Sequence, residues 1–303
     1  MPDPRFAAGA AFTQDGFVPI AEAKISVLDW GFTRSDCTYD VVHVDHGAFF
    51  RLADHLDRFE TAMRKRRLAP PQTRAEMEEI LHRVVALTGL QRAYVAMIAL
   101  RGRPSAGGSR RPADCVNHFI AYATPWVDVM TPEVQARGGH LWIASTPRVP
   151  DASYDPTVKN YMWGDLTTGL LEAHDHGFDT AVLLDAAGYV TEGPGFNVFM
   201  VKDGAVLTPD RGSLGGITRR SVLDLCAEQG IPASIAPITR AMLEDADEIF
   251  AASTAGGVMP ISRLNQRILG NDRPGPLSAK LRELYWQRHA QGWHATPVRY
   301  ETA

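Results

Sequence analysis

Apolar residues in the first part of the chain follow helical spacing in two segments and strand-like spacing in the others. Leu56, Phe59 and Met63 recur at helical spacing and predict a helix over residues 53–68. Thr73 is a typical N-cap and predicts the start of a second helix, over 73–87. Short apolar runs bounded by turn residues predict strands around these helices. The predicted strands cover residues 7–13, 17–19, 39–44, 48–51, 94–100 and 116–123.

The pattern changes after Pro125, where a short irregular stretch leads into a second group of elements. The strands predicted there cover residues 141–145, 180–184, 196–201, 205–208 and 248–252, and the helices 166–174, 218–229 and 277–289. We see no internal repeat. The order of elements predicts an α/β protein with a small N-terminal α/β domain over 1–124, an interdomain linker over 125–137 and a large C-terminal domain over 138–303.

Composition narrows the class of protein. With 303 residues the chain can bury a substantial core, and its net charge of −4 gives no bulk attraction to nucleic acid or to a membrane surface. No apolar run approaches the length of a membrane span, and the N-terminal Met-Pro-Asp-Pro-Arg does not resemble a signal peptide. We therefore expect a cytoplasmic protein, and its ordinary globular composition favours an enzyme.

The cysteines and histidines predict neither a disulfide framework nor a metal site. Three cysteines lie far apart along the chain, which fits a reducing compartment. His174 and His176 are spaced by two, so a helix would place them on different faces, and no His-Glu-x-x-His motif occurs. We expect no bound metal.

Lys159 has the most informative sequence context. The chain contains five lysines, and the four at positions 24, 65, 202 and 280 have polar or charged neighbours. Lys159 lies among aromatic and apolar residues, in Val-Lys159-Asn-Tyr-Met-Trp163. Desolvation there would lower the pKa of its ammonium and make the amine a usable nucleophile. A lysine that extends to water is the common alternative.

Three further segments are suited to hold an anion. The glycine-rich turn 212–216 runs into the helix predicted from Thr218, and a helix start offers free N–H groups and the positive end of a dipole. Ser253 and Thr254 lie in a turn of small residues after a predicted strand, where backbone can approach an anion. Arg58 lies in a predicted helix beside apolar residues and suits bidentate contact with phosphate. Each signal is weak by itself.

Together these segments match the needs of one cofactor. The chain lacks the glycine motifs of nucleoside triphosphate and dinucleotide sites. A single phosphate site, the amine of Lys159 and the acid Glu192, in Thr-Glu192-Gly-Pro-Gly-Phe-Asn, remain to be explained. Pyridoxal 5′-phosphate requires a Schiff-base lysine, a phosphate cup and a carboxylate facing its pyridine nitrogen.

The same segments carry a family resemblance that spans nearly the whole chain. The chain resembles fold-type IV pyridoxal-phosphate enzymes, which include branched-chain and D-amino acid aminotransferases, (R)-selective amine transaminases and aminodeoxychorismate lyase. The matching segments are Asp54-His-Leu-Asp-Arg58-Phe, Val158-Lys159-Asn, Thr191 to Asn197, Gly216-Ile-Thr-Arg219 and Ser253-Thr-Ala-Gly-Gly257. The resemblance implies an α+β small lobe, a larger α/β lobe with a mixed-sheet or barrel-like core that binds the cofactor, and a homodimer.

The resemblance also implies roles for individual residues. Lys159 would be the catalytic Schiff-base lysine, and Glu192 would pair with the pyridine nitrogen. The residues implied to hold the phosphate are Arg58, Ile217, Thr218 and Thr254, with Ser253 beside them. Phe196 and Leu214 would flank the ring.

Within this family the chain is most similar to (R)-amine transaminases, through Gly31 to Val41 and Pro156 to Asp165. The likeness implies a substrate site formed by Tyr39, Val41, Tyr94, Ala96, Trp163 and Ala255. Ala96 occupies a position where that subgroup typically has glutamate, so the preferred amine is left open. An arginine of the loop 101–111, such as Arg103, would bind the carboxylate of a keto acid, although a solvated basic loop fits the pattern equally well.

The resulting hypothesis is a ping-pong amino transfer. An (R)-configured primary amine, or a D- or branched-chain amino acid, would give its amino group to an α-keto acid such as pyruvate, with Lys159 moving the proton. A branched-chain or D-amino acid aminotransferase and an aminodeoxychorismate lyase of the same fold remain alternatives. So does a non-catalytic protein that binds a phosphate ligand in a degenerate site.

Overall fold

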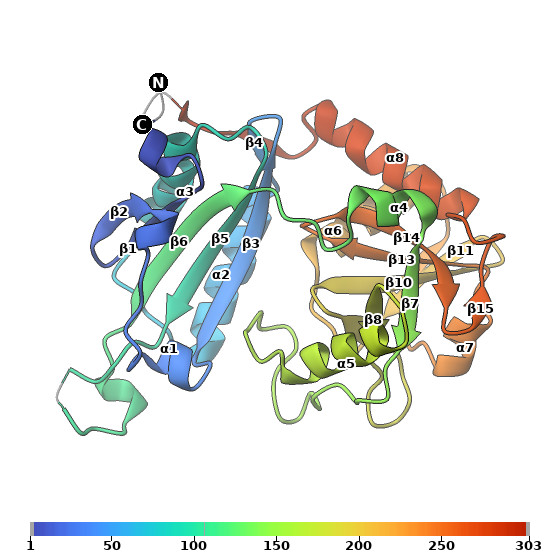
Figure 1. Ribbon diagram of the computed structural model, residues 1–303, viewed down its shortest axis with the longest axis horizontal. Helices are drawn as coiled ribbons and strands as arrows, with labels where there is room; N and C mark the ends of the chain where they lie inside the picture. Colours follow the sequence, from blue (N-terminus) through green and yellow to red (C-terminus); the bar gives the residue numbers. More distant parts are fainter. Residues whose placement is uncertain (1–2, 106, 301–303) are drawn as a thin grey trace. The chain divides into compact units, whose positions relative to one another are not determined.

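The computed structural model describes residues 3–105 and 107–300, which form two compact units. The first unit contains the residues up to Val127, the segment Val158–Tyr161 and the described residues from Gly292 onward (Figure 1). The second contains Asp128–Thr157 and Met162–Gln291. Lys159 is therefore part of the first unit, although it is more than thirty residues beyond Val127 in sequence.

An antiparallel sheet of seven strands, in the order β16-β4-β3-β5-β6-β1-β2, forms the first unit. Its strands are β1 (Ala10–Thr13), β2 (Gly16–Pro19), β3 (Cys37–Asp45), β4 (Ala48–Phe50), β5 (Ala93–Leu100), β6 (His118–Pro125) and β16 (Ala295–Pro297). The α-helices of this unit are α1 (Trp30–Thr33), α2 (Leu52–Arg66) and α3 (Arg74–Thr88), and short 3-10 helices cover Pro4–Phe6, Ile20–Glu22 and Pro112–Asp114.

Alternation along β3 and β5 separates the two faces of this sheet. Val42 and Val95 belong to the core that α2 and α3 complete with side chains such as Phe59, and these helices lie against one face in Figure 1. Val41 pairs with Ala96, and both point to the other face because successive side chains in a strand alternate. One face is therefore covered by α2 and α3, and the opposite face carries a separate cluster of buried side chains that includes Val41 and Ala96.

A mixed sheet of nine strands forms the second unit, with the path β12-β11-β10-β13-β14-β7-β8 and with β15 beside β14 and β9 beside β10. Its strands are β7 (Gly139–Ile143), β8 (Thr180–Val182), β9 (Glu192–Gly193), β10 (Phe196–Lys202), β11 (Ala205–Pro209), β12 (Ala233–Ala236), β13 (Glu248–Ser253), β14 (Gly257–Leu264) and β15 (Arg267–Ile268). Its helices are α4 (Pro132–Arg137), α5 (Gly164–Asp175), α6 (Ile217–Glu228), α7 (Arg240–Glu244) and α8 (Pro276–Ala290). The two sheets with their helices confirm the predicted α/β class.

Local signals predicted most helices well. The N-cap at Thr73 is confirmed as a full capping box, because its hydroxyl accepts from the Glu76 N–H and the Glu76 carboxylate accepts from the Thr73 N–H. Strand β1 begins at Ala10, three residues later than predicted, because Pro4–Phe6 forms a 3-10 helix and Gly9 has a φ of 140°. None of the helices among residues 3–105 and 107–300 is long and apolar enough to cross a membrane.

The main error concerns β14, which the sequence pattern did not predict although it lies between β13 and β7 in the sheet. Pro260 interrupts its apolar run, and proline normally indicates an edge strand or a loop. Pairing with β7 begins only at Ile261, after the proline. The helix α4 was also missed, because its six residues give too short a pattern to be recognised.

Candidate active site

The segment that carries Lys159 is attached to strand β3. The Lys159 carbonyl oxygen accepts hydrogen bonds from the Tyr39 N–H at 3.2 Å and from the Thr38 hydroxyl at 2.7 Å. Its Nζ lies 4.6 Å from the centre of the Tyr39 ring, a distance suited to a cation–π contact. Tyr161 stacks on the same ring at 4.1 Å. These contacts hold a partly buried lysine at one end of the strand.

Beside Lys159, six residues form an apolar and aromatic surface that we call the aromatic wall. Tyr39, Val41 and Ala96 pack together, and three partly buried side chains complete it. The wall consists of Tyr39, Val41, Tyr94, Ala96, Ile98 and Tyr122. Burial raises the pKa of the Tyr94 and Tyr122 phenols, so both stay neutral hydrogen-bonding groups at physiological pH. Four predicted substrate residues are thus brought together on one sheet face.

Arg58 is held by a fully buried carboxylate. Asp40 Oδ2 accepts from Arg58 Nε and Asp40 Oδ1 from Arg58 Nη2, both at 2.7 Å. His55 Nδ1 lies 2.8 Å from Asp40 Oδ1, one helical turn from Arg58 on α2. Burial would raise the pKa of the Asp40 carboxyl, but the charges and hydrogen bonds of Arg58 and His55 outweigh it and hold that pKa well below its usual range. Asp40 therefore remains ionised and orients the guanidinium.

The arginines of the loop after β5 differ in their surroundings. Arg101 is buried and donates to the Asp36 carboxylate and to the carbonyls of Arg66 and Arg67, which makes it a structural residue. Arg103 is exposed and lines a cavity of about 930 Å³ whose described lining residues include none of the aromatic wall. In the first unit, Arg103 is therefore not grouped with the other predicted substrate residues.

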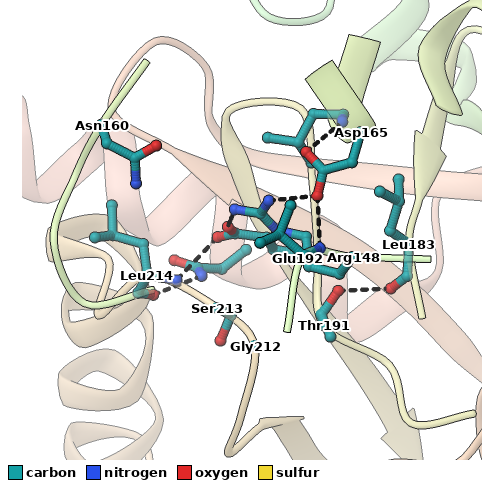
Figure 2. Close-up of polar contacts among 12 residues, drawn as sticks. Arg148, Asn160, Asp165, Leu183, Thr191, Glu192, Gly212, Ser213 and Leu214 are labelled. Atoms are coloured by element: carbon teal, nitrogen blue, oxygen red, sulfur yellow. Dashed lines mark hydrogen bonds and ion pairs between the residues drawn. The ribbon is translucent and has the colours of Figure 1, made fainter. Parts of the chain in front are cut away.

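In the second unit, Glu192 is held by donors on both of its oxygens (Figure 2). Glu192 Oε1 lies 3.0 Å from Arg148 Nη2, and Oε2 accepts from the Leu214 N–H at 2.9 Å. Arg148 Nη1 in turn donates to Asp165 Oδ2 at 2.6 Å. Burial would lower the pKa of Arg148, but Glu192 and Asp165 raise it overall, so the guanidinium stays charged. The carboxylate predicted to face a pyridine nitrogen is thus fixed in orientation.

The turn before α6 is shaped for close backbone approach. Asn197 Nδ2 donates to the Leu214 carbonyl, which with the Glu192 contact secures both polar groups of the Leu214 backbone. Ile217 and Thr218 begin the helix, and the N-cap Gly216 has no side chain to accept from its first N–H groups. A twelve-residue helix with such a start presents its N–H groups and positive dipole end to an anion.

The remaining predicted residues of the second unit lie at strand ends and turns. Phe196 is buried at the start of β10, and Ser253 ends β13, where its hydroxyl donates to the Gly195 carbonyl at 2.8 Å. Thr254 and Ala255 follow in the turn to β14, and the Ala255 N–H donates to Ser253 Oγ. Trp163 is the N-cap residue of α5.

Replacing Gly216 tests the turn before α6. We expect Gly216→Ala to lower the free energy of unfolding by about 1–3 kcal/mol, because its Cβ would overlap Asn197 Oδ1 and displace the side chain that binds Leu214. Gly215→Ala is the matched control, since its Cβ would meet no atom within 4 Å. Urea unfolding of both variants measures the difference, and equal stabilities would contradict the close packing.

Several residues of these clusters were missed in the sequence. Asp40 and His55 have a local signal, namely a carboxylate inside an apolar strand and a histidine three positions before Arg58. Thr38 and Tyr161 adjoin predicted site residues and have no signal of their own. Arg148 and Asp165 lie in segments whose pairing only the folded chain reveals. Among the described residues, no cluster of three or more histidine, cysteine or acidic side chains could hold a metal ion.

Comparison with known proteins identifies the family. The family model described as amino-transferase class IV matches residues 38–264. The chain belongs to the class IV aminotransferases. It is 31% identical over 271 residues to a putative branched-chain-amino-acid aminotransferase of Methanocaldococcus jannaschii, covering 89% of this chain and 92% of that protein. It is 34% identical over 241 residues to the branched-chain-amino-acid aminotransferase of Pseudomonas aeruginosa, covering 79% and 78%.

Solved structures of this aminotransferase family have the same fold. The T.th. branched-chain amino acid aminotransferase with pyridoxamine 5′-phosphate has a TM-score of 0.88 and 30% identity, covering 96% of this chain and 99% of that one. The Escherichia coli enzyme has a TM-score of 0.86 and 25% identity, covering 92% and 94%. This aminotransferase therefore depends on pyridoxal phosphate, and the predicted enzyme class, fold type and cofactor are confirmed.

Each unit contains groups that fit this cofactor. The first supplies the Lys159 amine beside the Tyr39 ring and a guanidinium oriented by Asp40. The second supplies an oriented carboxylate at Glu192 and the uncapped start of α6, which suits a phosphate. The groups of the first unit thus suit an aldehyde and a phosphate, and those of the second suit a phosphate and a basic ring nitrogen, which are the groups that pyridoxal phosphate presents.

Proposed function

We propose that this aminotransferase takes the amino group of a donor with an apolar side chain and gives it to an α-keto acid. The observation that carries the proposal is the aromatic wall, because it includes Tyr39, whose N–H and ring both contact Lys159. Its side chains are aliphatic or aromatic, so it favours an apolar group over a charged one.

Bound pyridoxal phosphate would supply an aldehyde carbon that bonds amino groups and a ring that withdraws electrons from the carbon beside them. Lys159 Nζ would hold the cofactor at that aldehyde carbon, and the freed amine would be the group that takes and returns the proton of the donor carbon. Glu192 would accept a hydrogen bond from the protonated ring nitrogen. Arg58, Ile217, Thr218, Ser253 and Thr254 would hold the phosphate, with Phe196 and Leu214 beside the ring.

Branched-chain amino acids are the first candidate donors. The named relatives are branched-chain aminotransferases, and the aliphatic Val41, Ala96 and Ile98 suit a branched side chain. (R)-configured primary amines are the second candidate, supported by the sequence likeness of Gly31 to Val41 and Pro156 to Asp165 to that subgroup. Ala96 pairs with Val41 in the centre of the aromatic wall. Its small side chain leaves more space for the donor than a larger residue would.

Initial rates with four donors and pyruvate or 2-oxoglutarate as acceptor test this proposal. We expect kcat/KM for L-leucine or (R)-1-phenylethylamine to exceed that for D-alanine by at least about tenfold, since each buried methylene is worth 10-fold or more. The (S)-amine serves as the stereochemical control. A preference for D-alanine would refute an apolar donor site, and release of pyruvate from an aminated chorismate without any acceptor would favour the lyase.

A homodimer is part of the same proposal. Val27, Leu28 and Phe32 are large apolar side chains exposed in the first unit, and a second copy of the chain would cover them. Sedimentation at micromolar concentration tests the dimer, and a monomer with full activity would contradict it.

A further inference from the structure

Arg148 joins two carboxylates in the second unit, and this arrangement has no role in the function proposed so far (Figure 2). One guanidinium nitrogen contacts Glu192 and the other contacts Asp165. We propose that Arg148, oriented by Asp165, is a positioning residue that sets the basicity of Glu192 and so the protonation of the cofactor's ring nitrogen. The inference rests on the role proposed for Glu192.

The geometry restricts Glu192 to one orientation. Arg148 occupies one side of Oε1 and the Leu214 N–H one side of Oε2, so rotation of the carboxylate would break one or both contacts. Arg148 is itself restricted, because Asp165 Oδ2 also accepts from the Val149 N–H at 2.8 Å. Asp165 Oδ1 accepts from the Leu166 N–H near the start of α5. The chain of contacts thus extends from a helix start to Glu192.

The charges of Arg148, Asp165 and Glu192 interact strongly because all three side chains are largely buried. The side chains of Arg148, Asp165 and Glu192 are 10%, 7% and 10% exposed, so their charges are weakly screened by water. Two carboxylates share one guanidinium, which leaves the group of three with a net charge of −1. Arg219 adds a positive charge near Glu192, and its side chain donates to Ser213 Oγ. Arg148 lowers the proton affinity of Glu192, and Asp165 partly offsets that effect.

Substitutions of Arg148 and of Asp165 should therefore change the basicity of Glu192 in opposite directions. Arg148→Met removes the cation, so Glu192 becomes more basic and draws the proton away from the ring nitrogen. Asp165→Asn removes the competing charge but keeps an oxygen that can accept from Arg148 and Val149, so Glu192 becomes less basic. A purely structural role would give two variants that loosen the site in the same way.

Nitrogen-15 NMR of the holoenzyme, with the cofactor labelled at its ring nitrogen, measures this proton directly. We expect the resonance to move toward that of a neutral pyridine in Arg148→Met and toward that of a pyridinium in Asp165→Asn. For Arg148→Met we expect kcat to fall by about 10- to 100-fold, as is typical when a residue that orients a ligand group is lost. Arg240→Met is the matched control, because Arg240 pairs with Glu244 at the surface, and it should leave both readouts unchanged.

Arg148→Lys keeps the inference testable if the methionine variant does not fold. A lysine ammonium retains the charge but cannot donate to both carboxylates in the planar geometry of a guanidinium. In Arg148→Lys the ring-nitrogen resonance should move in the same direction as in Arg148→Met, by a smaller amount. Shifts of the same sign in Arg148→Lys and Asp165→Asn, or no shift in either, would overturn the inference.

A separate variant distinguishes failure of this inference from failure of the proposed function. Glu192→Gln should shift the ring-nitrogen resonance fully toward the neutral form if Glu192 is the group that faces it. An unchanged resonance in that variant would refute the role of Glu192, whatever the Arg148 and Asp165 variants show. A full shift there without opposite shifts in the other two would refute only the role of Arg148.

Discussion

Lys159→Ala is expected to lose at least about 10³-fold in turnover and the visible absorption of covalently bound cofactor. In the proposed function the amine both bonds the cofactor and moves the proton, so its loss would remove both roles, and proton transfer alone is worth 10²- to 10⁴-fold. The fold should be retained, because the contacts that anchor this segment use the Lys159 carbonyl and not its side chain. Absorption spectra and single-turnover kinetics measure the two losses.

Lys202→Ala is the control for this prediction. Lys202 lies at the end of β10 and pairs with Asp245 and Asp247 near the surface, so its removal should leave spectrum and turnover unchanged. A Lys159→Ala protein with normal amino transfer would refute the assignment of the catalytic lysine. Restored activity with added small amines would instead support it, since a free amine can replace the missing base.

Asp40→Asn is expected to lower the free energy of unfolding by about 3–5 kcal/mol, the usual cost of breaking a buried ion pair by removing one partner. The Asp40 side chain is 0% exposed and accepts from Arg58 while contacting His55, so its loss leaves a guanidinium that is only 13% exposed without its compensating charge. Because Arg58 is a proposed phosphate ligand, we also expect weaker cofactor binding. Urea unfolding and cofactor titration measure the two effects.

Asp57→Asn is the matched control on the same helix. Asp57 also pairs with an arginine, Arg74, but its side chain is 67% exposed, and such surface pairs contribute no more than about 1 kcal/mol. Equal losses in the two variants would contradict the buried pair as a source of stability. Both substitutions remove a carboxylate from an arginine, but Arg74 keeps Glu60 as a second partner, so Asp57→Asn gives the small loss expected for an exposed pair.

The pH dependence of stability follows from the same cluster. The pKa of Asp40 is lowered in the folded chain, so its contribution is fully present above its unfolded pKa of about 4 and is lost as the pH falls further. Burial lowers the pKa of His55 despite the attraction of Asp40, so its contribution begins to fall below about pH 6.5. Below about pH 4 the Asp40→Asn protein should therefore lose less stability than the wild type, and between about pH 6.5 and 4 it should lose more, because Asp40 is the group that raises the pKa of His55.

Local patterns in the sequence predicted the elements that depend on nearby residues. The capping box at Thr73 and the helical spacing of Leu56, Phe59 and Met63 define α3 and α2 because a helix is stabilised by contacts three and four positions apart. The strand β14 was missed because its pairing with β13 and β7 outweighs the local effect of Pro260. Strand pairing is decided by partners distant in sequence, which a local pattern does not contain.

The candidate site likewise contains residues that a local pattern reveals and residues that only distant partners identify. Motifs around Arg58, Lys159 and Glu192 were recognisable because each combines a reactive side chain with glycines or apolar neighbours in one short segment. Asp40, Arg148 and Asp165 were not recognised as site residues. Arg148 contacts Glu192 across 44 positions, and a charged residue in a loop gives no local sign of such a partner.

Residue types in short segments were therefore sufficient to predict the cofactor class, the family and a Schiff-base role for Lys159. Tertiary structure decided what surrounds those residues. It attached Lys159 to β3 through Thr38 and Tyr39, placed Val41 opposite Ala96 in the aromatic wall, and joined Asp165, Arg148 and Glu192. The physical reason is that strand register and buried ion pairs join residues far apart in sequence, and only the folded chain specifies those partners.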